Sequence, residues 1–309
     1  MLSMGAVPVW VEPLWQVALG AVAALAALVV VYGLIRLVQP AVGAIVYTTS
    51  REGLAQPLFY VLLFVGTLAL LAFPFLPYNT FGEDVKMLKT SGLTLIMVLA
   101  IVLALWTASV SIADEIEGRT ALTLLSKPIR RWQFIVGKFL GILGPVAVLF
   151  ILLGALFLAT VSFKVVYDAR ESSSPMPTGA ECLGEMVRIV PGLVLYFLQV
   201  VVLTAISVAI STRLPMLANL IICSTIYVLG NLMPLLVQSG AGRFAIVEFM
   251  GYLIATVLPV LEYFNVEPQV MAGSEVPIAY IAWVAVYSLA YSSAALLVAL
   301  LLFEERDLA

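Results

Sequence analysis

The sequence predicts an all-α polytopic membrane protein with about seven transmembrane helices. Hydrophobic residues make up 63% of its 309 residues and charged residues only 11%, whereas ordinary soluble domains carry about 25% charged residues. A helix needs about 20 mostly apolar residues to cross a bilayer. The stretches that meet this requirement are residues 14–37, 57–76, 92–112, 134–160, 189–211, 217–237 and 277–303.

Two further segments are expected to lie at the membrane surface. Residues 48–57, TTSREGLAQP, mix polar and apolar side chains and suit a short surface helix that turns into the membrane at Pro57, although a plain loop is the alternative. Residues 246–264 are apolar but contain Glu248, Pro259 and Glu262, which favours a re-entrant or interfacial helix before the last span. The two glutamates could form an outer gate, or they could lie in water at the interface.

Some spans contain residue types that promote helix association. Asn219 and Asn231 lie in the stretch 217–237 and are expected to form interhelical hydrogen bonds, although either could instead face a substrate path. Gly137 and Gly141 form a G-x-x-x-G spacing, which allows two helices to approach closely, either within one subunit or between two copies.

The composition excludes several kinds of function. The chain has no histidine, so catalysis by a Ser-His-Asp or Cys-His group and the HExxH metal site are excluded. Its net charge of −3 argues against a nucleic-acid partner. The two cysteines, Cys182 and Cys223, are far apart in the sequence and are expected to be free thiols without a metal.

The connector from residue 114 to residue 138 is rich in charge and lies between two predicted spans. It must lie in water on one side of the bilayer, and the distribution of Lys and Arg predicts which side, because cytoplasmic loops are enriched in these residues. Placing it in the cytoplasm puts nine of the 15 Lys and Arg residues inside. We therefore expect a multi-pass protein of the inner or plasma membrane, with a cytoplasmic C-terminus and an outside N-terminus.

The connector has the pattern of a short helix followed by a turn. Acidic residues open it and basic residues close it, which complements a helix dipole. Apolar residues recur at spacings of three and four, and Pro128 interrupts them. We expect a helix over residues 115–125, a turn at 126–128, and a second helix that continues into the membrane. Such a segment can bind a groove of a partner protein or lie on lipid headgroups.

The sequence of this connector, EIEGRTALTLLSKPIRRWQFIVGKFLG, resembles the signature of ABC-2 type transporter permeases. It is most similar to the group that includes the nitrous-oxide-reductase maturation and gliding-type exporters. The matching positions are Glu115, Glu117, Gly118, Thr120, Leu124, Pro128, Arg131, Gly137 and Lys138. In that family this segment is the coupling helix that engages an ATPase, so the resemblance implies docking residues at Glu115, Glu117, Gly118, Arg119, Thr120, Leu124, Pro128, Arg131 and Lys138.

The resemblance implies the permease subunit of an ATP-driven exporter. Its partners would be a cytoplasmic ABC ATPase, which binds ATP and Mg, and a second permease that is an identical copy or a paralogue. Permeases of this family usually have six spans and a cytoplasmic N-terminus. We therefore expect residues 1–39 to hold an extra transmembrane span and residues 40–309 to form the permease domain.

The chain lacks the phosphate-binding loop of an ATPase. That loop needs the spacing G-x-x-x-x-G-K followed by Ser or Thr, and the one Gly-Lys pair, Gly137-Lys138, is preceded by Trp132 in place of the first glycine and followed by Phe139. We expect no cofactor in this chain. The alternatives are an assembly or scaffold protein that binds a cytoplasmic partner without transport, and an intramembrane enzyme, for which the spans lack convergent catalytic side chains.

Overall fold

The computed structural model describes residues 8–76, 84–113, 130–173, 175–238 and 258–304, and every regular element within these ranges is helical. Within these described ranges, six segments are long and apolar enough to cross a membrane, and α10 (Met216–Gln238), at the predicted span of residues 217–237, contains a shorter apolar helix. The six segments are α1 (Leu14–Val38), α3 (Pro57–Ala72) with η1 (Phe73–Phe75), α4 (Asp84–Ala108) with η2 (Ser109–Ala113), α7 (Arg131–Glu171), α8 (Gly179–Val187) with α9 (Val190–Ser211), and α13 (Ile278–Glu304). The prediction of an all-α multi-pass membrane protein is confirmed.

Prolines divide the first part of the chain into three helices. Gln39 and Gln56 precede prolines and adopt non-helical backbone conformations, because a proline disfavours helix in the residue before it. Pro40 and Pro57 then begin α2 (Pro40–Ala55) and α3, positions where the missing N–H costs no hydrogen bond. The expected turn at Pro57 is confirmed, and the helix before it is longer than residues 48–57 and follows directly after α1.

The connection between the predicted spans at residues 134–160 and 189–211 is mostly helical. α7 continues to Glu171 because its last turns stay packed. Lys164 is buried, and its Nζ lies 3.6 Å from a carboxylate oxygen of Asp84 and 3.8 Å from one of Asp168. Thr178 then caps α8, accepting a hydrogen bond from the backbone N–H of Glu181 at 3.3 Å.

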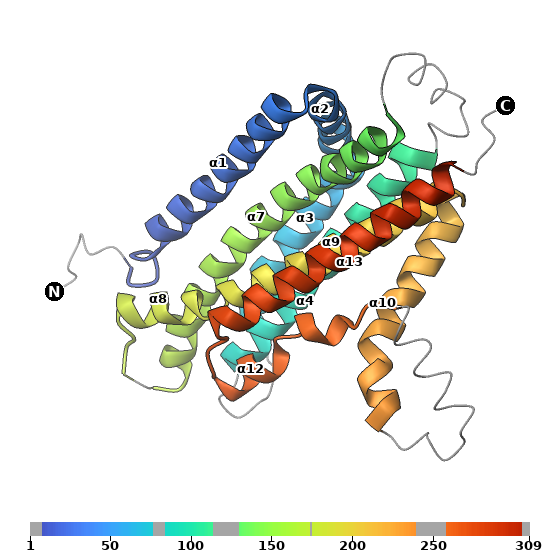
Figure 1. Cartoon of the computed structure of the whole chain (residues 1–309). Helices are drawn as coiled ribbons and strands as arrows, with labels where there is room; N and C mark the ends of the chain where they lie inside the picture. Colours follow the sequence, from blue (N-terminus) through green and yellow to red (C-terminus); the bar gives the residue numbers. More distant parts are fainter. Residues whose placement is uncertain (1–7, 77–83, 114–129, 174, 239–257, 305–309) are drawn as a thin grey trace.

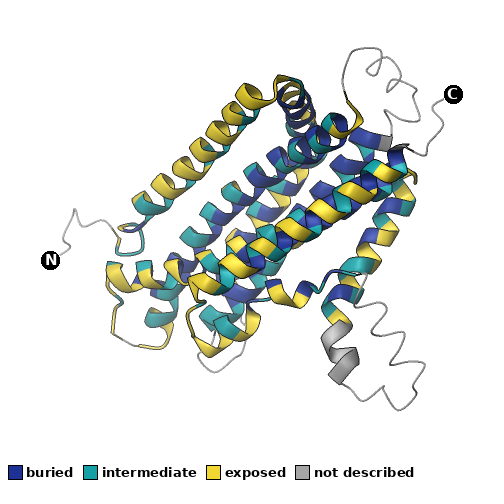
Figure 2. Cartoon of the chain, in the orientation of Figure 1, coloured by how far each residue is buried: buried dark blue, intermediate teal, exposed yellow. Residues whose placement is uncertain are grey.

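The buried core lies among α4, α7 and α9 (Figure 1), and α3 and α13 cover it with outward faces that remain exposed (Figure 2). α4 and α7 approach closely at Gly92, where a Cβ atom would lie only 2.1 Å from the ring of Phe157. Only glycine fits at that position. Before the last span, η4 (Leu261–Phe264) and α12 (Glu267–Ala272) are short, and the part of the predicted re-entrant helix before residue 258 lies outside the described residues.

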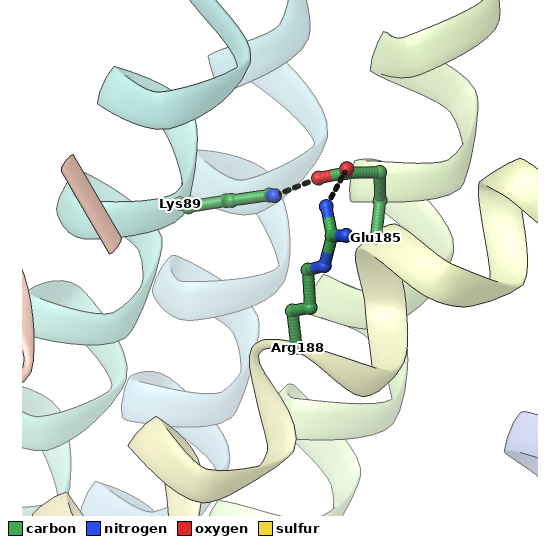
Figure 3. Close-up of polar contacts among 3 residues, drawn as sticks. All are labelled: Lys89, Glu185 and Arg188. Carbon is green, nitrogen blue, oxygen red and sulfur yellow. Dashed lines mark hydrogen bonds and ion pairs between the residues drawn. The ribbon is translucent and has the colours of Figure 1, made fainter. Parts of the chain in front are cut away.

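An ion-pair cluster joins α4 to α8 at one end of the helical bundle (Figure 3). Glu185 of α8 contacts the ammonium group of Lys89 of α4, whose side chain is only 8% exposed. The guanidinium of Arg188 donates to the other carboxylate oxygen of Glu185 at 2.8 Å. One carboxylate therefore neutralises a buried cation and holds α8 against the end of α4.

We predict that Glu185→Gln lowers the stability of the purified protein. The substitution keeps the shape but removes the charge facing buried Lys89, which should cost on the order of 2 kcal/mol at a partly exposed site. Arg188→Gln is the control, because the side chain of Arg188 is 50% exposed and exposed pairs contribute less than about 1 kcal/mol. Thermal unfolding in detergent checks both variants, and an equal or smaller loss for Glu185→Gln would contradict this role.

Candidate docking site

The described part of the predicted docking segment begins where α4 ends. There the α-helix widens into the π-helix η2, Ser109–Ala113, a type of irregularity that is frequent at functional sites. Ser109 is fully buried, and its hydroxyl donates to the carbonyl of Leu105 at 2.8 Å. Residue 114, the first of the docking segment, follows η2 directly. We call the two described elements that flank the segment, η2 and the start of α7, its two bases.

The second base is the start of α7. Arg130 is the N-cap residue, and its backbone N–H donates to the side-chain oxygen of Gln133 at 2.9 Å. Arg130, Arg131 and Trp132 are exposed here, so a partner could contact them. The predicted second helix, which continues from the connector into the membrane, is confirmed from Arg131 onward. Arg131 is the one exposed residue of the predicted docking set that the structure describes.

Lys138 joins the two bases. It lies two turns into α7, is only 3% exposed, and donates from Nζ to the hydroxyl of Ser111 in η2 at 2.9 Å. The same ammonium lies 5.8 Å from the centre of the Phe134 ring, a distance suited to cation–π attraction. Lys138 therefore links α7 to η2 inside the bundle instead of lying on the outer surface.

For the other residues predicted for docking and gating, the structure shows no shared site. Glu115, Glu117, Gly118, Arg119, Thr120, Leu124, Pro128 and the gate candidate Glu248 lie outside the described residues. The second gate candidate, Glu262, is exposed in η4. The docking and gating roles of these residues remain predictions.

Asn219 is the centre of a buried polar cluster next to η2. Its side-chain NH₂ lies within hydrogen-bonding distance of three hydroxyl oxygens, those of Ser109 at 2.7 Å, Ser207 at 2.8 Å and Ser211 at 3.0 Å. Its carbonyl oxygen accepts from the thiol of Cys223 at 3.2 Å. An amide NH₂ has two protons, so the three hydroxyl oxygens share two N–H groups. The cluster connects η2, α9 and α10.

Asn231, about three turns further along α10, makes a different contact. Its NH₂ group donates to the carbonyl of Tyr227 in the same helix at 2.8 Å. The expected interhelical role is thus confirmed for Asn219, whereas the hydrogen bond seen for Asn231 is local. Cys223 is a buried free thiol, as is Cys182, in agreement with the expectation from the sequence.

A row of glycines lets α2 pack tightly on α7. A Cβ on Gly137 would lie 2.8 Å from Ile45, one on Gly141 would lie 2.6 Å from Thr49, and one on Gly144 would lie 2.4 Å from the hydroxyl of Ser50. The G-x-x-x-G spacing is therefore used within the chain. This packing holds α2 beside the start of α7, at the same end of the bundle as η2 (Figure 1).

A partly polar recess of about 470 Å³ opens between the end of α2, the start of α3 and the end of α4. Glu52, Gln56 and Thr107 are among its lining residues, and so is Ser111, which also accepts the hydrogen bond of Lys138. The recess therefore adjoins one base of the docking segment. The sequence predicted neither this recess nor the role of the serines, although Ser207 and Ser211 share a helix face by their spacing of four.

Comparison with known proteins identifies the class of this molecule. A model of the ABC-2 family of transporter proteins matches residues 20–308, nearly the whole chain. No curated protein is similar enough to match it. The chain belongs to the ABC-2 transporter family and is a multi-pass permease subunit of an ABC transporter. Membership implies a cytoplasmic ABC ATPase and the lipid bilayer as partners.

The family match also bears on the N-terminal helix. It begins at residue 20, inside α1, so most of the predicted extra span lies within the matched region. The proposed boundary between residues 39 and 40 remains a prediction. At that boundary Gln39 breaks the helix before Pro40, and a Cβ on Gly43 would lie 2.6 Å from the backbone of Arg36. α1 and α2 thus meet in a close turn.

We predict that Asn219→Leu destabilises the protein more than Asn231→Leu does. Leu has the same number and branching of side-chain heavy atoms as Asn but cannot connect the hydroxyls of η2 and α9, and interhelical hydrogen bonds in membranes contribute about 0.6 to 1.7 kcal/mol. The same change at Asn231 removes one bond within a helix. Thermal unfolding of both variants in one detergent is the measurement, and equal midpoints would contradict the connecting role of Asn219.

Proposed function

We propose that this chain is the membrane subunit of an ABC exporter and that segment 114–138 couples it to a separate ATPase. ATP and Mg would bind to that ATPase, and a second permease, identical or paralogous, would complete the transport path. The observation that carries the proposal is the bond between Lys138 and Ser111, which joins both bases of the docking segment inside the bundle. A force applied to the segment would therefore reach α4 and α7 together.

The contacts around η2 supply a route for that force. The cluster at Asn219 connects η2 with α9 and α10, and α7 packs along α2 through the glycines described above. We infer that closure of two ATPase subunits moves the docking segments and tilts the attached helices as rigid bodies, which opens the path toward the other side. In this account Arg131 contacts the ATPase, and Lys138 keeps the two bases in register.

The recess beside η2 offers a second contact for the same partner. Its rim includes the carboxylate of Glu52, which is exposed, and the amide of Gln56. We propose that a basic side chain of the ATPase enters this recess while the docking segment binds the ATPase surface. Opposite charges at a partly exposed contact favour orientation and association rate more than affinity.

The proposal is tested by replacing Glu117 and Arg131 together by Ala. We expect the double variant to insert normally and to bind the ATPase more weakly, so that transport-stimulated ATP hydrolysis falls several-fold. The matched control replaces Arg170 and Glu171 together by Ala. These two residues are exposed and oppositely charged at the other end of α7, and the control should leave coupling unchanged. The measurements are ATP hydrolysis and ATP-dependent solute flux in reconstituted vesicles.

Two outcomes would contradict the proposal. Unchanged coupling in the Glu117/Arg131 variant would remove the docking role of the segment. ATPase binding without any ATP-dependent flux of a candidate solute, in vesicles where the unaltered complex is intact, would favour an assembly or scaffold protein instead.

A further inference from the structure

An apolar groove of about 790 Å³ separates α1 from α7 and α9. On α1 its lining residues extend from Gln16 to Ile35, and small residues such as Gly20 and Ala24 recur along this wall. The opposite wall includes Ala147 and Gly154 of α7, and residues of α8 and α9 complete it. Because almost all of its lining is apolar and both walls are spanning helices, the groove lies within the hydrocarbon region.

The groove exists because α1 is attached to the rest of the chain mainly at its two ends. At the α2 end, the hydroxyl of Tyr32 donates to the Ser50 hydroxyl at 2.7 Å and also contacts the carbonyl of Val46. Beyond the other end of α1, the hydroxyl of Ser162 donates to the carbonyl of Trp10 at 2.9 Å. Between these attachments none of the 25 residues of α1 is buried, and the helix stands beside α7 (Figures 1 and 2).

The length of the groove matches the membrane interior. From residue 16 to residue 35 the wall is about 28 Å long at 1.5 Å per residue, close to the thickness of the hydrocarbon core. An apolar occupant can therefore lie along α1 over most of that thickness.

The charges at the two ends of the groove differ in sign. Arg36 follows the lining residue Ile35 at the α2 end and is exposed. Beyond the start of α1, the exposed residue Glu12 lies against α8, where a Cβ on Gly179 would be 2.4 Å from a Glu12 carboxylate oxygen. A phosphate is attracted to an arginine and repelled by a carboxylate. An amphiphile with a phosphate head is therefore favoured in one orientation, with its head at the α2 end.

We propose that this groove binds an acyl chain of a bilayer phospholipid, with its phosphate beside Arg36 and its chain running along α1 toward α8. The acyl chain fills a space that no side chain of the protein fills, and it supplies the dispersion contacts that the two walls of the groove do not make with each other. Closing the groove would gain little instead, because apolar helix faces in a bilayer have no hydrophobic driving force to associate.

Two glycines of α1 provide a matched test. Gly20 lines the groove and Gly33 does not, and a Cβ on either one meets no atom within 4 Å. The full-length protein is reconstituted in vesicles of phosphatidylethanolamine and phosphatidylglycerol that contain a phospholipid with a photoreactive diazirine on its acyl chain. After illumination, the labelled peptides are identified by mass spectrometry, and labelling of the exposed face of α13 serves as the internal reference.

We expect the unaltered protein to be labelled on the groove faces of α1 and α7. Gly20→Trp should lower that labelling several-fold relative to α13, and Gly33→Trp should leave it unchanged. Equal labelling of the groove in the two variants would overturn the proposal. The proposal would also be overturned if the groove of the unaltered protein were labelled no more strongly than the exposed face of α13.

A second variant keeps the proposal testable if Gly20→Trp does not fold. Arg36→Glu reverses the charge at the α2 end without filling the groove, and we expect it to lower retention of a phospholipid by the detergent-purified protein several-fold in native mass spectrometry. Unchanged retention would contradict the proposed orientation of the head. A disulfide formed between two copies that carry Ala24→Cys would overturn the proposal, because it would place another protein chain in the groove.

Discussion

The bilayer core offers no hydrogen-bonding partners, so burying a polar group there is costly unless the chain itself supplies a partner. This constraint explains where the helices are held together. At one end of the bundle, the ammonium of Lys138 is bound by Ser111, and the amide of Asn219 is surrounded by three serines. At the other end, Lys89 is matched by the carboxylate of Glu185. Between these ends the contacts are mainly apolar.

The polar end with Lys138 is also the end where the described chain stops at Ala113 and resumes at Arg130. A coupling element can transmit force only if its two bases do not move independently. The direct bond between η2 and α7 provides this condition, and α2 adds a third element through its close packing at Gly141 and Gly144. Membership in the ABC-2 family supplies the class of partner, and this arrangement supplies the mechanical reason for placing that partner here.

Much of the fold could be predicted from the sequence because its strongest determinants are local. Long apolar stretches give spanning helices, and Pro40 and Pro57 fix helix boundaries through their effect on the preceding residue. The spacing of Gly137 and Gly141 predicted a close helix contact, but the element that fills it, α2, could not be named. Which helix packs against these glycines depends on the three-dimensional arrangement, and the glycine spacing alone does not determine it.

The candidate site was predictable only in part. The charge pattern and the family signature predicted a docking segment, which stays a prediction, and an asparagine in an apolar span indicated a polar contact, which the structure shows at Asn219. The π-helix at the end of α4 has no clear sequence signature, so the meeting of Ser109 with Asn219 could not be foreseen. Lys138 was predicted as part of a docking surface from its place in the signature. Its burial follows from the tertiary contact with Ser111, which lies 27 residues away in the chain.

The most direct test of this account is the accessibility of the docking segment in living cells. The two native cysteines are buried and can be replaced by serine, after which a single cysteine is introduced as Arg131→Cys. A membrane-impermeant maleimide should then label the protein only after the cells are opened, and the bound ATPase should protect that position. Labelling of intact cells, or equal labelling with and without the ATPase, would contradict the central claim that this segment binds a cytoplasmic motor.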